Sequence, residues 1–175
     1  VIDLSDYLAG EPGALPRLAA RICEAMETVG FMVITGHGVP EATIDDAFAQ
    51  ARRYHAQPLD QKQALALDEH NNGYMAQGRY AIVTSQYAET DTPELNESFF
   101  FKRERRPDDP QVRPGRRFVG PNQWPVELPG FRAAALAYAD AMDGLAMRLL
   151  PAVAAALDLD PDHFEGHFAP SQFSV

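Results

Sequence analysis

The stretch Gly30-Phe31-Met32-Val33-Ile34-Thr35-Gly36-His37-Gly38-Val39-Pro40 organises the first third of this chain. Its apolar, β-branched run over residues 31–35 predicts a short buried strand. The glycine-flanked His37 predicts a turn directly after the strand, where the histidine satisfies nearby backbone groups. Pro40 suits the first turn of a helix because its fixed φ is already helical. The stretch therefore predicts a strand that links two helices.

Working outward, a helix is predicted on each side of this strand. The upstream helix has Pro16 in its first turn and Gly30 as its C-cap. Its apolar residues recur on one helical face, and they are Leu15, Leu18, Ala19, Ile22, Met26 and Val29. The downstream helix runs from Pro40 to about Ala56, and a first strand is predicted over residues 1–4.

The remaining elements are short apart from one long helix. A short helix is predicted over residues 60–67, a turn at Asn71-Asn72-Gly73 and a strand over residues 97–101. A long helix is predicted from Phe131 to Leu157, with Pro151 interrupting or kinking it.

A further short helix is expected to begin at Asp160, and residues 173–175 alternate as the start of a strand does. Three or four short strands cannot close a barrel. The fold class is therefore helix-rich α+β.

Composition bounds the function. The chain has 175 residues, about one domain, with 46% hydrophobic and 23% charged residues. Acidic residues outnumber basic ones by 25 to 15, which argues against nucleic acid as a partner. The apolar runs are too short for a bilayer, so no membrane partner is expected. The single cysteine, Cys23, excludes an internal disulfide and fits a packing role in a reducing, cytoplasmic setting.

Basic charge is concentrated in residues 102–117, which hold seven of the 15 basic residues together with three prolines. One interpretation is a solvated, proline-punctuated connector. The other is a local site for an anion or a protein partner.

A metal site is a minor hypothesis. His163, Glu165 and His167 stand close together, and the two histidines are one helical turn apart. The order differs from the H-E-x-x-H zinc motif because the glutamate is in the wrong place. A surface helix with two ordinary histidines is the main interpretation, and a small metalloprotein is the alternative.

Several landmarks occur in the order of a known family. They are Ile2-Asp3-Leu4, the Gly30–Pro40 stretch, Asn72-Gly73-Tyr74, Asn96-Glu97-Ser98-Phe99, Gly120-Pro121-Asn122-Gln123-Trp124-Pro125 and Pro129-Gly130-Phe131-Arg132. Together they resemble the N-terminal region of the isopenicillin N synthase-like oxygenases, which are non-haem Fe(II), mostly 2-oxoglutarate-dependent dioxygenases. The resemblance covers nearly the whole chain but only about half of a family member.

The resemblance implies that the parent protein uses Fe(II), 2-oxoglutarate and O2 to oxidise a small organic substrate. It implies one N-terminal unit over residues 1–175, with an α/β part over 1–118 and a long helix over 119–175. That helix would lead into a double-stranded β-helix (jelly-roll) that is largely missing from this chain. The edges of the chain, Val1 and Val175, then suggest a fragment.

The family's iron ligands are a His-x-Asp pair and a distant His, and an Arg-x-Ser pair holds 2-oxoglutarate. Neither pair occurs here, so the resemblance assigns no metal ligand and no catalytic residue to this chain. Its implied role is that of scaffold and pocket wall. The oligomeric state cannot be read from the sequence.

The resemblance also implies substrate-binding residues: Asn71, Tyr74, Met75 and Phe99. Isopenicillin N synthase has an arginine at the position of Asn71, and an asparagine cannot supply that charge. Arg79 is a candidate replacement, in a loop over residues 73–92 that would border the substrate mouth. Ser174 lies near another substrate-contacting position.

The alternative function class is a non-catalytic interaction module built from this half alone. Its contact surface would be residues 103–117. Such a module should not leave a large apolar face open on the long helix.

Overall fold

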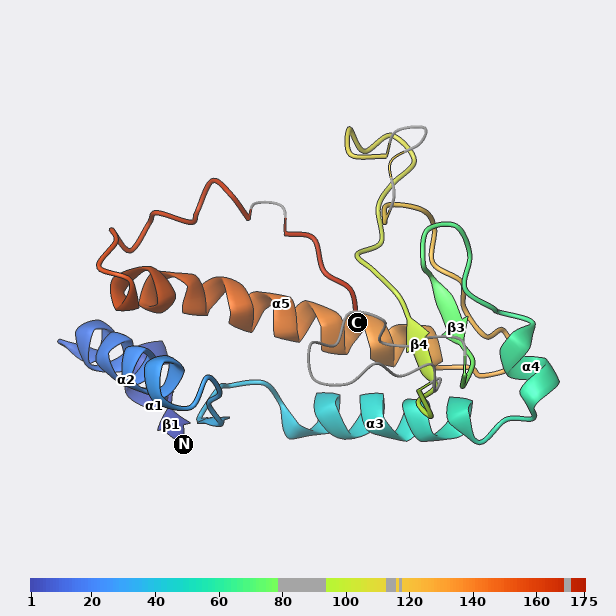
Figure 1. Cartoon of the computed structure of the whole chain (residues 1–175), viewed down its shortest axis with the longest axis horizontal. Helices are drawn as coiled ribbons and strands as arrows, with labels where there is room; N and C mark the ends of the chain where they lie inside the picture. Colours follow the sequence, from blue (N-terminus) through green and yellow to red (C-terminus); the bar gives the residue numbers. More distant parts are fainter. Residues whose placement is uncertain (79–93, 113–115, 117, 169–170) are drawn as a thin grey trace. The chain divides into compact units, whose positions relative to one another are not determined.

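A computed structural model describes residues 1–78, 94–112, 116, 118–168 and 171–175 of the chain (Figure 1). The chain forms two compact units. Unit 1 comprises Val1–Asp45 and Ala137–Ser171, and unit 2 comprises Asp46–Leu136 and Gln172–Val175. The predicted division into an α/β part over residues 1–118 and a long helix over residues 119–175 stays a prediction.

Unit 1 begins with β1 (Ile2–Asp3), α1 (Ser5–Leu8) and α2 (Ala14–Thr28), and β1 pairs in parallel with β2 (Ile34–Thr35). Gly30 ends α2 as predicted, with φ +79° and its N–H bonded to the Ala25 carbonyl. Of the buried strand predicted over residues 31–35, only Ile34–Thr35 forms a strand, and the prediction of burial is wrong, because Ile34 is half-buried and Thr35 is exposed. Phe31 is 82% exposed, because the two-residue β1 offers a partner only to Ile34 and Thr35.

The turn after β2 requires glycine. Gly36 has φ +61°, and a Cβ there would lie 2.2 Å from Ser5 Oγ and 2.4 Å from Asp3 Oδ1. His37 Nδ1 accepts a hydrogen bond of 3.1 Å from the Val39 N–H, which confirms the structural role predicted for this histidine.

The core of unit 1 joins the apolar face of α2 to the part of α5 (Phe131–Ala156) that belongs to this unit. Its buried residues are Ile2, Leu4, Leu18, Ile22, Val39, Leu145 and Ala152. Pro151 lies inside α5 and does not interrupt it. The short helix predicted after Asp160 is wrong, because the backbone bonds there join residues only three apart, as in His163 N–H to Asp160 O, and Gly166 disfavours a helix.

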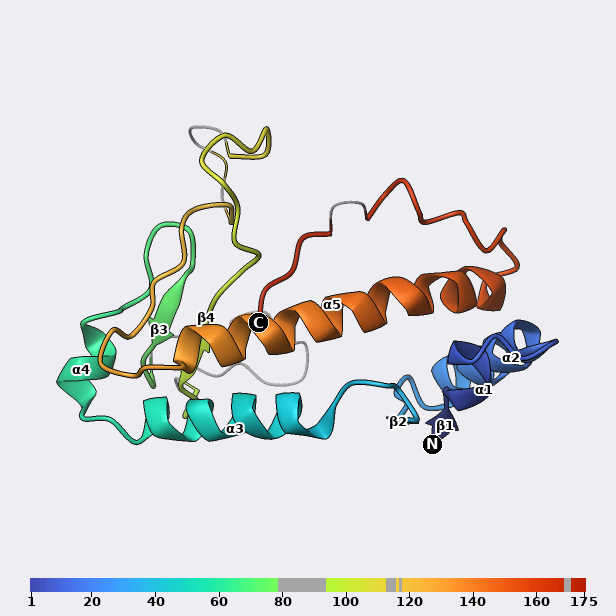
Figure 2. The same ribbon diagram turned by 180° about the vertical axis from the view of Figure 1, so that it is seen from behind.

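Unit 2 holds most of α3 (Glu41–His55), together with α4 (Leu59–Gln63), β3 (Gly73–Met75) and β4 (Ser98–Phe100). β3 and β4 lie side by side (Figure 2). They are antiparallel, with Tyr74 opposite Phe99. The predicted helix over residues 60–67 ends earlier, at Gln63. It ends there because the N–H groups of Leu65 and Ala66 bond only three residues back, and the Leu67 N–H donates to the Tyr74 carbonyl at 3.0 Å, which ties the segment to β3.

An aromatic cluster forms the core of unit 2. Tyr54, Tyr74 and Phe131 are buried, and Phe99 and Trp124 pack against them. The Tyr54 and Phe99 ring centroids are 4.7 Å apart in an edge-on arrangement, which is favourable for aromatic pairs. Successive residues of a strand point to opposite faces, so Tyr74 and Phe99 face this cluster and their neighbours face away from it.

The end of the chain adds to this sheet region. Phe101 and Val175 exchange backbone hydrogen bonds of 3.0 and 2.9 Å, and Lys102 bridges Ser174 in antiparallel fashion. Where a strand start was predicted over residues 173–175, the structure shows an isolated bridge at Ser174. The structure is thus a mixture of helix and sheet, as predicted.

No helix in the described part of the chain combines the length and the apolar character that crossing a membrane would need.

Candidate functional site

A hollow of about 540 Å³ lies on the face of β3 and β4 that points away from the aromatic cluster. Apolar side chains dominate its wall, and one lysine, two amides and a serine complete it. The lining residues are Leu67, Asn71, Met75, Phe100, Lys102, Phe118, Gln172, Phe173 and Ser174. A cavity of this size with a few polar groups suits a small organic ligand.

The structure divides the four predicted substrate residues between two places. Asn71 and Met75 line the hollow, as does Ser174. Tyr74 and Phe99 belong to the aromatic cluster, and Tyr74 is 1% exposed. Arg79 and most of the predicted 73–92 loop lie outside the described residues. Substrate contact by these residues stays a prediction.

The corner at Asn71-Asn72-Gly73 positions the rim of the hollow. Asn71 adopts φ +56°, and Gly73 adopts φ +109° with space for no side chain, because a Cβ would lie 2.3 Å from the Leu65 carbonyl oxygen. Asn72 is fully buried, and its Nδ2 donates to the Pro121 carbonyl at 2.8 Å. A buried amide needs such partners, so the corner has one well-defined conformation.

Lys102 was not singled out from the sequence. It is only 4% exposed, and its Nζ donates to the Asn71 carbonyl at 2.5 Å and to Asn72 Oδ1 at 2.7 Å. Burial lowers the pKa of the Lys102 ammonium, and the charge of Asp68 opposes that shift. The available sequence signal was a basic residue directly after the aromatic run 99–101.

A second polar cluster lies at the other end of the same strands. Glu97 Oε2 accepts a hydrogen bond of 2.8 Å from Lys62 Nζ and another from the Tyr74 hydroxyl, and His55 Nδ1 lies 3.1 Å from Glu97 Oε1. These contacts, the Lys62 bond first, lower the pKa of Glu97 to about 2. The Tyr74 hydroxyl donates its hydrogen bond to Glu97, so it already has a partner within the protein.

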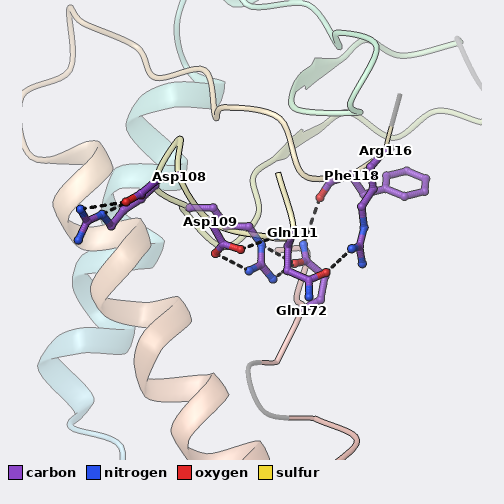
Figure 3. A network of polar contacts seen from close by, with 8 residues as sticks. Asp108, Asp109, Gln111, Arg116, Phe118 and Gln172 are labelled. Carbon is purple, nitrogen blue, oxygen red and sulfur yellow. Dashed lines mark hydrogen bonds and ion pairs between the residues drawn. The ribbon is translucent and has the colours of Figure 1, made fainter. Parts of the chain in front are cut away.

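The described residues of the basic segment 102–117 include solvated and nearly buried arginines, each paired within the chain, and a role in binding an anion or a protein partner stays a prediction. Arg106 is a solvated side chain whose Nε lies 3.1 Å from Asp108. Arg105 is almost buried, and it binds Asp109 at 2.9 Å and Gln172 Oε1 at 2.7 Å (Figure 3). This network ties Gln172, at the rim of the hollow, to the segment.

The metal hypothesis for His163, Glu165 and His167 is wrong. Within residues 1–78, 94–112, 116, 118–168 and 171–175, no group of three or more His, Cys, Asp or Glu side chains is placed to hold a metal ion. The described residues therefore do not fit an iron ion.

Comparisons with known proteins agree with one another. Residues 1–127 match the family described as non-haem dioxygenase in morphine synthesis, N-terminal. The chain is 32% identical over 169 residues to a 2-oxoglutarate-Fe(II) type oxidoreductase, hxnY, of Emericella nidulans, covering 94% of this chain and 47% of that protein. It is 28% identical over 165 residues to validamycin A dioxygenase of Streptomyces hygroscopicus, covering 94% of this chain and 44% of that protein.

Solved structures give the same result. A 2OG-Fe(II) oxygenase family protein from Caulobacter crescentus is similar with a TM-score of 0.71 and 25% identity, over 94% of this chain and 50% of that one. A full-length Neurospora crassa protein, solved in complex with alpha-KG, shares the fold with a TM-score of 0.73 and 23% identity, over 94% of this chain and 48% of that one. The chain thus spans about half the length of the curated relatives it matches.

Proposed function

Because the chain belongs to the family of non-haem dioxygenase N-terminal domains, we propose that its parent protein is an Fe(II)- and 2-oxoglutarate-dependent oxidoreductase. In this proposal it activates O2 and oxidises a small organic substrate. The match over residues 1–127, together with 32% identity to a 2-oxoglutarate-Fe(II) type oxidoreductase, carries the proposal. It favours an oxygenase over the alternative of a non-catalytic interaction module.

In this proposal the present chain supplies scaffold and pocket wall, and a jelly-roll in the rest of the protein supplies the iron and 2-oxoglutarate ligands. The single cysteine supports the proposal that the protein is cytoplasmic.

The contribution of this chain to the reaction is then geometric. Met75 and Phe100 offer apolar surface to the substrate from the outward face of β3 and β4. Their strands are held from behind by the aromatic cluster, so this wall is rigid. A rigid wall fixes the orientation of the substrate and excludes water from one side of it.

The activity is tested on the full-length protein by following succinate formation from 2-oxoglutarate with added Fe(II) and a panel of small organic molecules. We expect succinate formation that a chelator abolishes and that some members of the panel accelerate. No Fe(II)-dependent turnover of 2-oxoglutarate with any member would contradict the proposed activity.

The wall is tested with Met75→Ala. We expect a raised KM for the accelerating substrate and an unchanged KM for 2-oxoglutarate, because only the substrate contacts this wall. Leu59→Ala is the matched control, since Leu59 is a 54% exposed apolar residue of unit 2 outside the hollow. If both variants changed only the KM for 2-oxoglutarate, the hollow would not be the wall of the substrate pocket.

A further inference from the structure

Lys102 is a buried cation at the wall of the hollow, and its position is fixed through its backbone. Asn122 Oδ1 accepts the Lys102 N–H at 2.9 Å, and Asn122 Nδ2 donates to the Lys102 carbonyl at 2.7 Å. The antiparallel bridge to Ser174 lies at the same residue. The Cα of Lys102, from which the side chain extends, is therefore held in one position.

The ammonium is held by neutral groups. An ammonium has three donors, and here the Asn71 carbonyl and Asn72 Oδ1 take two of them. The ring centroid of Phe118 lies 5.7 Å from Nζ, and both Asn71 and Phe118 line the hollow. Within the described part of the chain, no carboxylate is within ion-pair distance of Nζ.

The charge of Asp68 acts on the Lys102 ammonium from beyond ion-pair distance and opposes the effect of burial only in part. Burying a cation without a directly bonded anion is costly, and dipoles of amide oxygens offset only part of that cost. A packing role alone would be filled at lower cost by a methionine, which has a similar length. The charge becomes favourable when an anionic group enters the hollow and accepts the third hydrogen bond.

We propose that Lys102 selects a ligand that carries a carboxylate on an apolar body, with Leu67, Met75 and Phe100 contacting that body. The proposal rests on the function proposed above, in which the hollow belongs to the substrate pocket. The carboxylate could come from the substrate or from 2-oxoglutarate itself, and the inference is that it belongs to the substrate.

The test is binding of phenylacetate and phenylacetamide to the metal-free full-length protein, followed by calorimetry. The two probes share their apolar body and differ in charge. We expect the acid to bind more tightly by about tenfold, the value of one charge-assisted hydrogen bond. We expect Lys102→Gln to abolish the difference, since glutamine keeps a donor for the two asparagine oxygens but carries no charge.

Lys62→Gln is the matched control, because Lys62 is an equally buried lysine of unit 2 that does not line the hollow. It should leave the preference for the acid intact. Circular dichroism shows that each variant is folded before binding is measured. Excess 2-oxoglutarate should not displace phenylacetate, and displacement would assign the carboxylate to 2-oxoglutarate and overturn the inference.

Equal binding of acid and amide, binding of neither probe, or a preference that Lys102→Gln retains would each overturn the proposal. The binding test needs neither iron nor turnover. Its failure is therefore distinguishable from failure of the proposed oxygenase activity, which the succinate assay reports.

Discussion

Lys62 and Lys102 are buried to nearly the same extent in the same compact unit, at 8% and 4% exposed, yet different chemistry holds them. Lys62 donates to the Glu97 carboxylate at 2.8 Å, and this bond raises the pKa of Lys62. Lys102 donates to neutral amide oxygens, and burial lowers its pKa. The first lysine has its counter-ion within the chain, and the second lies beside a hollow.

The difference shows how one fold uses the same side chain in two ways. A buried charge with its partner contributes to a defined structure, and removing either member leaves the other uncompensated. A buried charge without a directly bonded anion is available for a ligand. The predictions below separate these two roles.

The largest effect is expected for Lys62→Met. It leaves Glu97 in a mostly buried site without its main partner, and we expect the free energy of unfolding to fall by about 3 kcal/mol. Urea denaturation of the full-length protein measures it. Arg106→Met is the control, because its ion pair with Asp108 is solvated, and equal losses for both variants would contradict the structural role of Lys62.

The second largest effect is expected on the stability of the folded protein at acidic pH. The pKa of Glu97 is held at about 2 in the folded protein, below its ordinary value of 4.5. The stabilisation by the Glu97 carboxylate is therefore fully present above pH 4.5 and is lost as the pH falls from 4.5 towards 2. Urea midpoints across this window should show a smaller drop for Glu97→Gln than for the natural protein. Parallel curves would show that Glu97 does not contribute.

A smaller effect is expected for Tyr74→Phe. It removes the hydroxyl that donates to Glu97 but keeps the ring in the aromatic cluster, so we expect a loss of about 1.5 kcal/mol. The substrate KM should not change, because the hydroxyl faces away from the hollow. A raised substrate KM with unchanged stability would instead show that Tyr74 contacts the substrate, as the family resemblance implied.

The smallest effect on stability is expected for Lys102→Met. The variant loses hydrogen bonds to Asn71 and Asn72 but is relieved of a buried charge, so we expect a change of about 1 kcal/mol or less. Comparing its urea midpoint with that of Lys62→Met tests the contrast directly. A loss as large as that of Lys62→Met would make Lys102 a structural residue.

The sequence predicted the local elements well where local chemistry specifies them. Pro16 lies in the first turn of α2 and Gly30 follows its end, as predicted. The asparagine-glycine corner also forms where its residue types predict it. Predictions failed where a distant partner decides the outcome. The strand over residues 31–35 is short because β1 is short, and α4 ends early because the Leu67 N–H bonds to Tyr74 of β3.

The candidate site was predicted in part. Asn71 and Met75 could be found from the family's landmarks, and the structure places both at the hollow. For Lys102 the sequence offered only its place after the aromatic run 99–101, and for Glu97 only its place in a family landmark, and neither reveals burial or a partner. Their roles depend on residues 30 and 35 positions away in the chain.

By itself, the sequence determined the family of this chain, its three long helices and its glycine-dependent turns, because these depend on neighbouring residues and on the order of landmarks. Only the tertiary structure decided that Tyr74 and Phe99 face the aromatic cluster while Met75 and Phe100 face the hollow. It also decided which lysine meets a carboxylate. Burial and pairing are set by contacts between segments far apart in the chain, and a linear pattern does not contain those contacts.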